Sequence, residues 1–294
     1  MHKAVCFGEI LWDLFPEGKQ IGGAPFNVAK QLSNFGMHCD FISAVGNDSL
    51  GEELMNILGE TNISKEQLQI KTELPTGKVE VILDEKGSAS YTIFEPVAWD
   101  AIKIEQEHKN LVSNSDVFIY GSLAARSKIS RDTLFQVLKS ARFKVFDVNL
   151  RPPHFTLKNL TGLLGEANLI KMNDDEINLI CNKLAFKKNG IEDRMLFLAE
   201  KFNAGSVAVT LGSKGALLLH GGQFYESKSY SVKVQDTVGA GDAFLAALLS
   251  KLLLTNKPEA SLNFACAVGA LVASKTGANP EISEQEITRM LREE

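Results

Sequence analysis

In the N-terminal part of the chain, apolar runs typical of buried strands are separated by segments with the spacing of amphipathic helices. Residues 4–9 predict a first strand, and residues 39–45 predict a second. Pro25 suits the first turn of a helix that ends near residue 34, because proline fits there without losing a hydrogen bond. Asp48 is placed to cap a further helix that runs through residue 58.

The alternation becomes regular from residue 116 onwards. Four apolar runs separated by helical patterns predict parallel strands, and two short runs bounded by glycines predict an antiparallel edge. We therefore predict an α/β fold with a doubly wound, mainly parallel sheet flanked by helices. The predicted strands cover residues 117–120, 144–148, 169–172, 206–211, 216–220 and 224–227, and the last helices lie near residues 258–274 and 283–292.

Residues 77–94 depart from this pattern. Apolar and polar residues alternate on both sides of Glu85-Lys86-Gly87, as expected for two antiparallel strands joined by a turn. A hairpin among repeats of strand and helix predicts an excursion from the main sheet. We interpret this excursion as part of a lid or of a dimer surface.

Composition narrows the class of protein. The 294 residues are 45% hydrophobic, which is enough for the core of one main domain with an appendage. The net charge of -5 is spread without basic blocks, which argues against a nucleic-acid partner. The four cysteines form no CxxC pair and lie in apolar runs, which predicts reduced thiols. We find no signal peptide and no uncharged run of about 18 residues that would span a membrane, so we expect a soluble, cytoplasmic protein.

The stretch Asp236 to Phe244 (DTVGAGDAF) carries the strongest chemical signal. Its glycines precede a helix-forming run, so we expect a turn at a helix N-terminus, where free backbone N–H groups and the helix dipole favour an anion. In this turn Asp242 is expected to have a lowered pKa and to act as a base next to a bound phosphate. The alternative is that Asp242 only caps the helix.

Several other motifs are absent from the sequence. There is no GxxxxGK[ST] loop, and GAGDAF lacks the third glycine of a dinucleotide fingerprint, which disfavours a nicotinamide-dependent dehydrogenase. GxSxG and HExxH are also missing, so a hydrolase elbow and a zincin helix are unsupported. Phosphate binding therefore has to use a different glycine-rich turn.

DTVGAGDAF, together with GGAPFNVA near the N-terminus, resembles the two signatures of the PfkB, or ribokinase-like, family of carbohydrate kinases. The resemblance covers essentially the whole chain, and GEILWDLFP and FDVNLRP are most similar to the fructokinase branch. It implies one ribokinase-like kinase domain over residues 1–294, with a small β lid from about residues 12–21 and 75–95.

The implied reaction is transfer of the γ-phosphoryl group of ATP to a primary hydroxyl of a sugar, with fructose as the expected acceptor. In this resemblance Asp242 is the base, and the backbone N–H groups of Gly239, Ala240 and Gly241 bind the migrating phosphoryl group. Positioned donors and cations do most of the work in such a reaction, because the charge spreads over the phosphoryl oxygens.

The resemblance also implies which residues hold the sugar. Asp13, Gly23 and Asn27 match the family positions that contact sugar hydroxyls. Asn149 and Arg151 follow the end of a strand, in reach of the same cleft. Without the resemblance, Asp13 reads as a turn residue, Asn27 as a residue on a helix surface and Arg151 as a surface arginine.

Nucleotide and metal positions are carried over in the same way. Asn173 and Glu176 match the N-x-x-E motif, and Glu176 is expected to order the hydration shell of Mg²⁺, although this spacing also fits a helix capping box. Asp236 stands where many relatives bind a monovalent cation such as K⁺, but Glu281 replaces a hydroxyl residue that is frequent there. The other positions expected to contact ATP are Thr210, Gly212, Gly215, Asn263 and Asn279.

Alternatives stay open for the acceptor, the activity and the assembly. The acceptor could be 2-keto-3-deoxygluconate or another sugar of the family, and Tyr91 and Arg151 would then meet the carboxylate of the sugar acid. A non-catalytic regulator that binds a sugar or a nucleotide would also retain this fold. The alternating apolar positions of the hairpin further predict a homodimer through the β lid.

Overall fold

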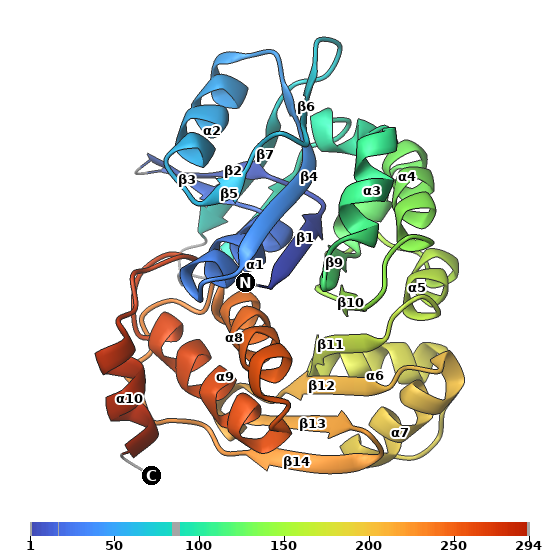
Figure 1. Cartoon of the computed structure of the whole chain (residues 1–294), viewed down its shortest axis with the longest axis vertical. Helices are drawn as coiled ribbons and strands as arrows, with labels where there is room; N and C mark the ends of the chain where they lie inside the picture. Colours follow the sequence, from blue (N-terminus) through green and yellow to red (C-terminus); the bar gives the residue numbers. More distant parts are fainter. Residues whose placement is uncertain (1, 17, 84–88, 293–294) are drawn as a thin grey trace.

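The structure is a computed structural model that describes residues 2–16, 18–83 and 89–292. It contains a large central sheet, helices on both of its faces and a small second sheet (Figure 1). The predicted doubly wound α/β fold is therefore confirmed.

The central sheet is parallel except at one edge, where β13 runs antiparallel to both of its neighbours. This edge is the one that the glycine-bounded runs predicted. Short β6 (Leu68–Lys71) pairs with β4 beside the main path. In spatial order the strands are β14 (Gln223–Ser227), β13 (Ala216–His220), β12 (Ser206–Thr210), β11 (Leu169–Asn173), β10 (Lys144–Asp147), β9 (Val117–Gly121), β1 (Lys3–Phe7), β4 (His38–Gly46) and β5 (Ile63–Ser64).

Two layers of helices cover this sheet, because successive strand residues point to opposite faces. Val5 and Phe7 of β1 pack with α3 to α7, whereas Ala4 and Cys6 pack on the side of α1, α2 and α8. Of the last helices, α9 packs against α8 and the antiparallel edge, and α10 packs against α9. The helices are α1 (Ala24–Asn34), α2 (Ser49–Gly59), α3 (Gln106–Ser113), α4 (Lys128–Leu138), α5 (Leu157–Leu164), α6 (Asp174–Lys183), α7 (Ile191–Phe202), α8 (Ala240–Thr255), α9 (Pro258–Ala273) and α10 (Glu284–Arg292), with short 3-10 turns η1 (Ala98–Ala101), η2 (Leu123–Ala125) and η3 (Gly212–Lys214).

The predicted starts of two helices are confirmed. Pro25 lies in the first turn of α1. The carboxylate of Asp48 accepts a hydrogen bond from the N–H of Gly51 at 2.8 Å and so caps α2.

The second sheet forms from the two segments that the sequence separated from the core. Its order is β3 (Gly18–Gly22), β2 (Leu11–Phe15), β7 (Gly77–Leu83) and β8 (Ala89–Ile93), and β7 and β8 pair antiparallel as predicted. The predicted turn at Glu85-Lys86-Gly87 lies outside the described residues, as does the side chain of Tyr91. The lid and the homodimer stay predictions.

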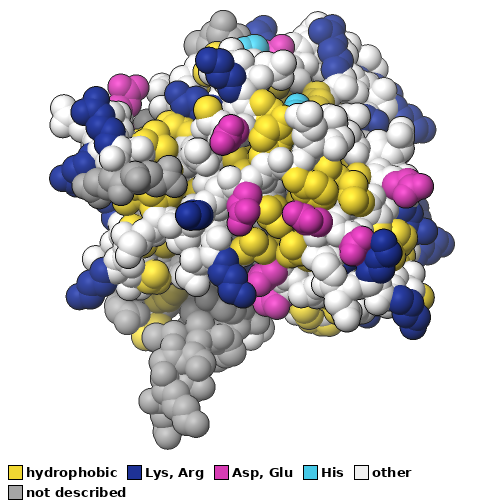
Figure 2. All heavy atoms as spheres, turned by 90° about the horizontal axis from the view of Figure 1, so that it is seen from below, with side chains coloured by type: hydrophobic (Ala, Val, Ile, Leu, Met, Phe, Trp, Pro, Cys, Tyr) yellow, Lys and Arg dark blue, Asp and Glu magenta, His cyan; other side chains and the backbone are white. Residues whose placement is uncertain are grey.

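The surface and the cysteines agree with the composition. On the face drawn in Figure 2, lysine and arginine side chains are spread over the surface with acidic side chains among them, and they do not gather in one stripe. All four cysteines, Cys6, Cys39, Cys181 and Cys266, are buried, and none of them forms a disulfide. Among the described residues, no helix has the length and apolar character that a membrane span requires.

Candidate active site

The glycine-rich turn lies at the N-terminus of α8, as the sequence predicted. Gly239 is the N-cap residue, and no side chain caps the helix there, which leaves backbone N–H groups at the positive end of the helix dipole. The N–H of Ala240 is partly engaged, because it donates to the carbonyl of Thr237 at 3.3 Å. The turn can therefore bind an anion, and the N–H of Gly241 is more available for this than the N–H of Ala240.

A second loop holds the turn in place. Gly239 has a φ of 77°, and a Cβ at this position would overlap the backbone carbonyl of Ala278. The carboxylate of Asp236 accepts hydrogen bonds from the N–H of Val238 at 2.9 Å and from the N–H of Gly277 at 3.0 Å. Asp236 thus ties the two loops together, and each of its oxygens already has a backbone donor.

We expect Gly239→Ala to loosen the turn. The strained φ and the overlap with Ala278 should cost about 1–3 kcal/mol in the free energy of unfolding and raise the KM for ATP severalfold, while the KM for the sugar changes little. Gly221→Ala is the matched control, because Gly221 also has a positive φ, 57°, but nothing lies within 4 Å of its added Cβ. Equal KM values for ATP in the two variants would contradict this role of Gly239.

Asp242 is the third residue of α8, and its side chain is buried. It accepts a hydrogen bond from Nδ2 of Asn27 at 2.8 Å. The predicted lowering of its pKa is wrong. Burial, followed by the negative charge of Asp147, raises the pKa of Asp242 to about 6, against the opposing effects of Lys171, Asn27 and Arg151. Desolvation at this depth outweighs the favourable end of the helix, and the resulting pKa suits a base that works near neutral pH.

A buried ion pair lies directly below the turn. Nζ of Lys171 in the middle of β11 lies 3.0 Å from a carboxylate oxygen of Asp147 at the end of β10. The same Nζ lies 3.1 Å from the position that a Cβ on Gly241 would occupy. Burial lowers the pKa of Lys171, but Asp147, Asp242 and Glu176 raise it by more, so the ammonium stays charged. Sequence reasoning missed this cation, and the one signal was a lysine inside an otherwise apolar strand.

The N-x-x-E motif forms a capping box at the start of α6. The N–H of Glu176 donates to Oδ1 of Asn173 at 2.8 Å, and the N–H of Asn173 donates to the carboxylate of Glu176 at 2.9 Å. The other carboxylate oxygen of Glu176 accepts from the N–H of Leu150 at 2.7 Å. Glu176 therefore joins the start of α6 to the loop after β10. Burial raises its pKa in spite of Lys171.

A cavity of about 610 Å³ opens beside the turn, within the size range of small-molecule sites. Four predicted nucleotide positions, Asn173, Thr210, Gly212 and Gly215, line it together with Ala240 and Gly241. Its apolar wall includes Tyr230, Val232, Phe244 and Ala270. This cavity has an anion-binding turn at one end and apolar side chains elsewhere, so a nucleotide can occupy it.

Two predicted adenine contacts do not belong to this cavity. Asn263 lies on α9, one turn before Cys266. Cys266 is the first residue of that helix to line the cavity. Asn279 instead donates through Nδ2 to Oδ1 of Asn27 at 2.7 Å. The predicted contacts of Asn263 and Asn279 with the adenine ring therefore stay predictions.

The predicted sugar residues gather near Asp242. Asn27 binds Asp242 directly, and a Cβ on Gly23, whose φ is 110°, would overlap the backbone carbonyl of Glu9. Burial raises the pKa of Asp13 to about 6, and the charge of Arg151 opposes this rise. The charge of the same arginine also lowers the pKa values of Asp242 and Glu9. Its positive charge is therefore shared among three desolvated carboxyls.

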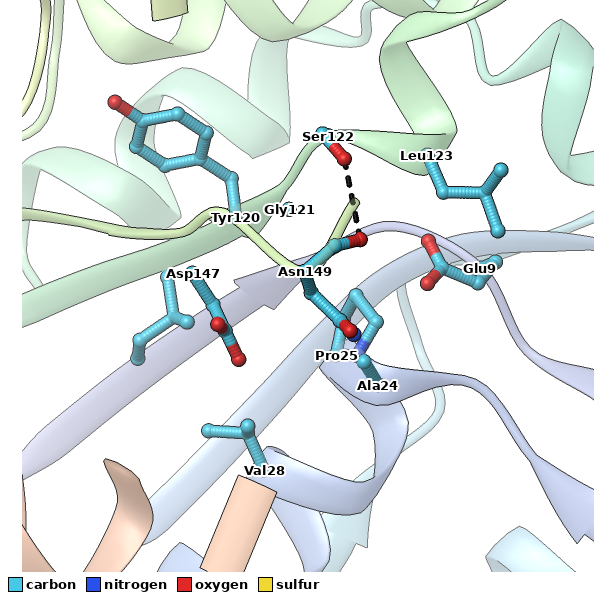
Figure 3. Close-up of a pocket in the computed structure, with 11 residues that line it drawn as sticks. Glu9, Ala24, Pro25, Val28, Tyr120, Gly121, Ser122, Leu123, Asp147 and Asn149 are labelled. Carbon is cyan, nitrogen blue, oxygen red and sulfur yellow. Dashed lines mark hydrogen bonds between the residues drawn. The ribbon is translucent and has the colours of Figure 1, made fainter. Parts of the chain in front are cut away.

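Glu9 is a site residue that sequence reasoning missed. It lines a small cavity together with Asp147 and Asn149, and Figure 3 shows Glu9 and Asp147 on either side of Asn149, whose carbonyl accepts from Ser122 at 3.3 Å. Among the described residues, Oε2 of Glu9 and Oδ2 of Asp147 are buried without a hydrogen-bond partner. Burial raises the pKa of Glu9 to about 7. Its position directly after the apolar first strand was the available signal.

Comparisons with known proteins agree with this geometry. Residues 1–285 match the pfkB family carbohydrate kinase model. The chain is 28% identical to the probable fructokinase-5 of Arabidopsis thaliana, over 95% of this chain and 93% of that protein. It is 32% identical to a putative sugar kinase of Pyrococcus horikoshii, over 92% of this chain and 90% of that protein.

Solved structures extend the likeness to the fold. The Pyrococcus horikoshii sugar kinase in complex with ATP has a TM-score of 0.81 at 29% identity and covers 99% of both chains. A 2-dehydro-3-deoxygluconokinase from Thermotoga maritima has a TM-score of 0.87 over 99% of this chain and 98% of that one, but at 21% identity this likeness is one of fold alone. The anion turn, the buried carboxylate and the family match agree, and the chain belongs to the pfkB family of carbohydrate kinases.

Proposed function

We propose that this carbohydrate kinase transfers the γ-phosphoryl group of ATP to a primary hydroxyl of a neutral sugar, with fructose as the preferred acceptor. The observation that carries the proposal is the position of Asp242. It is a buried carboxylate in the first turn of α8, between the large cavity and the cluster of Asp13, Asn27 and Arg151. A sugar hydroxyl beside it can lose its proton to the carboxylate as the phosphoryl group is transferred.

ATP is the proposed donor. Its phosphates would meet the turn at Gly239 to Gly241 and the ammonium of Lys171, and its base would lie against the apolar wall of the 610 Å³ cavity. The ATP complex of the Pyrococcus horikoshii relative supports this assignment. Developing charge on the phosphoryl oxygens would then face fixed donors instead of water, which is the main source of rate enhancement in such reactions.

Mg²⁺ fits the donor set beside this cavity. The described residues contain no group of three or more histidine, cysteine, aspartate or glutamate side chains that would form a metal cage. Mg²⁺ keeps several waters and needs few protein oxygens, so Glu176 is the residue proposed to order its waters. When bound, the ion neutralises phosphate charge. For Asp236 we propose a structural role in place of a K⁺ site, because its carboxylate joins Val238 of the anion turn to Gly277 and so ties the two loops together.

The charges at the acceptor end favour a neutral sugar over a sugar acid. Glu9 and Asp13 are both desolvated, and their pKa values are raised to about 7 and about 6. Arg126, a second arginine that acts on Glu9, is already bound to both carboxylate oxygens of Asp100 at 2.8 Å. A sugar acid would therefore add a negative charge beside two carboxyls that share Arg151. Sugar hydroxyls can instead donate to these carboxyls.

An acceptor panel tests this choice. We expect kcat/KM for fructose to exceed that for 2-keto-3-deoxygluconate by ~10-fold or more in an ADP-release assay, since a carboxylate loses affinity next to uncompensated like charge. Glu9→Gln removes one of the two carboxyls and should reduce the ratio of the kcat/KM values for fructose and 2-keto-3-deoxygluconate. A wild-type preference for the sugar acid would contradict the neutral-acceptor proposal while leaving the kinase reaction intact.

A further inference from the structure

Three carboxamides form a hydrogen-bonded chain that ends on Asp242. Nε2 of Gln31 donates to Oδ1 of Asn279 at 3.4 Å, and Nδ2 of Asn279 donates to Oδ1 of Asn27 at 2.7 Å. Nδ2 of Asn27 then donates to the carboxylate of Asp242 at 2.8 Å. Asn27 and Gln31 lie one turn apart on α1 and are almost fully buried, at 4% and 3% exposed. The amides thus connect α1, the loop before α10 and the start of α8.

Every link in this chain runs in the same direction. A carboxamide has a donor end and an acceptor end, so the partner at one end decides which end faces the other partner. Because Asn279 presents its NH₂ to the oxygen of Asn27, the NH₂ of Asn27 faces Asp242. If Asn27 were turned over, its oxygen would face the carboxylate, and that contact is favourable only when Asp242 is protonated.

Asn279 is itself held firmly. Gly277, two residues before Asn279, donates its N–H to Asp236 at 3.0 Å, and the backbone of Ala278 lies against Gly239 of the anion turn. The loop that carries Asn279 is therefore fixed to the turn that carries Asp242, so Asn279 and Asp242 keep a constant separation.

We propose that Asn279 is a positioning residue that sets the orientation of the Asn27 amide and so keeps Asp242 in its anionic, proton-accepting form. This inference rests on the proposed role of Asp242 as the base. The hydrogen bond from Asn27 is one of the effects that lower the pKa of Asp242 against the burial that raises it. The other charged groups that act on Asp242 are Asp147 of β10, Lys171 of β11, Arg151 of the loop after β10 and Glu9 after β1.

Substitution of Asn279 tests the direction of the chain. In Asn279→Asp the new carboxylate repels the amide oxygen of Asn27. The Asn27 amide relieves this repulsion by turning over, and its oxygen then faces Asp242. The acid limb of the kcat–pH profile should move up by about one pH unit, with a ~5-fold loss of kcat at pH 6 that disappears by pH 9. Asn279→Ala removes the donor without adding charge, and its acid limb should move in the same direction by a smaller amount.

Gln235→Glu is the matched charge control. Gln235 is exposed and accepts a 3.4 Å hydrogen bond from Thr276 of the same loop, but it is not part of the amide chain. Its kcat profile should match that of the wild type. The proposal would be overturned if the acid limb of Gln235→Glu moved as far as that of Asn279→Asp. It would also be overturned if the acid limbs of both Asn279 variants stayed at the wild-type pH.

The outcome is separable from that of the proposed function. Melting temperature and calorimetric ATP binding establish that each variant is folded, and Asn279→Ala decides the matter if Asn279→Asp does not fold. If Asp242→Asn is inactive while the profiles of the Asn279 variants are unshifted, the positioning role fails and the base assignment stands. If Asp242→Asn turns over normally, the base assignment itself fails.

Discussion

Asp242→Asn is expected to lower kcat by ~10²-fold or more, because the amide cannot accept the proton of the sugar hydroxyl. The asparagine oxygen can still accept the hydrogen bond from Asn27, so the local packing should persist. Burial raises the pKa of Asp242, which means that ionisation of this side chain costs folding free energy at neutral pH. The melting temperature of the variant should therefore equal or exceed that of the wild type.

A coupled ATP assay and thermal unfolding measure the two effects together. Lost activity combined with lost stability would favour a purely structural role for Asp242 through its hydrogen bond with Asn27, since no side chain caps α8 in the structure. Near-normal turnover would contradict its role as base.

Lys171→Met is the second substitution with a large expected effect. It removes the ammonium below the anion turn and leaves the carboxylate of Asp147 buried without its partner. We expect a ~10²-fold loss of kcat, of the size found when a donor to a developing oxyanion is removed. We also expect a loss of about 3–5 kcal/mol in the free energy of unfolding, because half of a buried ion pair remains.

Two controls separate the catalytic effect from the structural one. Lys144→Met breaks the pair between Lys144 and Glu166, which is 2.9 Å long but partly exposed, and should cost at most about 1 kcal/mol with normal turnover. In the double variant Lys171→Met with Asp147→Asn, both buried charges are gone, so stability should largely return while kcat stays low. Recovery of kcat together with stability would show that Lys171 acts only through the fold.

The sequence predicted the parts of this molecule that depend on local pattern. The apolar run that begins at residue 4 predicted β1 as a buried strand, and the glycine-rich turn before residue 243 predicted the start of α8. The FDVN and N-x-x-E segments marked the ends of β10 and β11 correctly, because parallel strands bring their carboxyl ends to one edge of the sheet.

The remaining site features depend on contacts between distant parts of the chain. The pKa of Asp242 on α8 is set mainly by burial and by the charge of Asp147, which lies on β10, far away in the sequence. The bond between Asn27 and Asn279 joins residues 252 positions apart, and no short motif contains both. Glu9 follows the apolar strand β1 and Lys171 lies inside the apolar strand β11, and the burial and partners of both residues follow only once the sheet is assembled.

The most direct test of a sugar kinase with Asp242 as its base is ³¹P NMR of the product formed from ATP and fructose by the purified protein. We expect one phosphate ester on a primary carbon of the sugar, formed together with ADP, and no detectable ester when Asp242→Asn is assayed for the same time. Absence of any sugar ester with the wild-type protein, or equal ester formation by Asp242→Asn, would contradict this expectation.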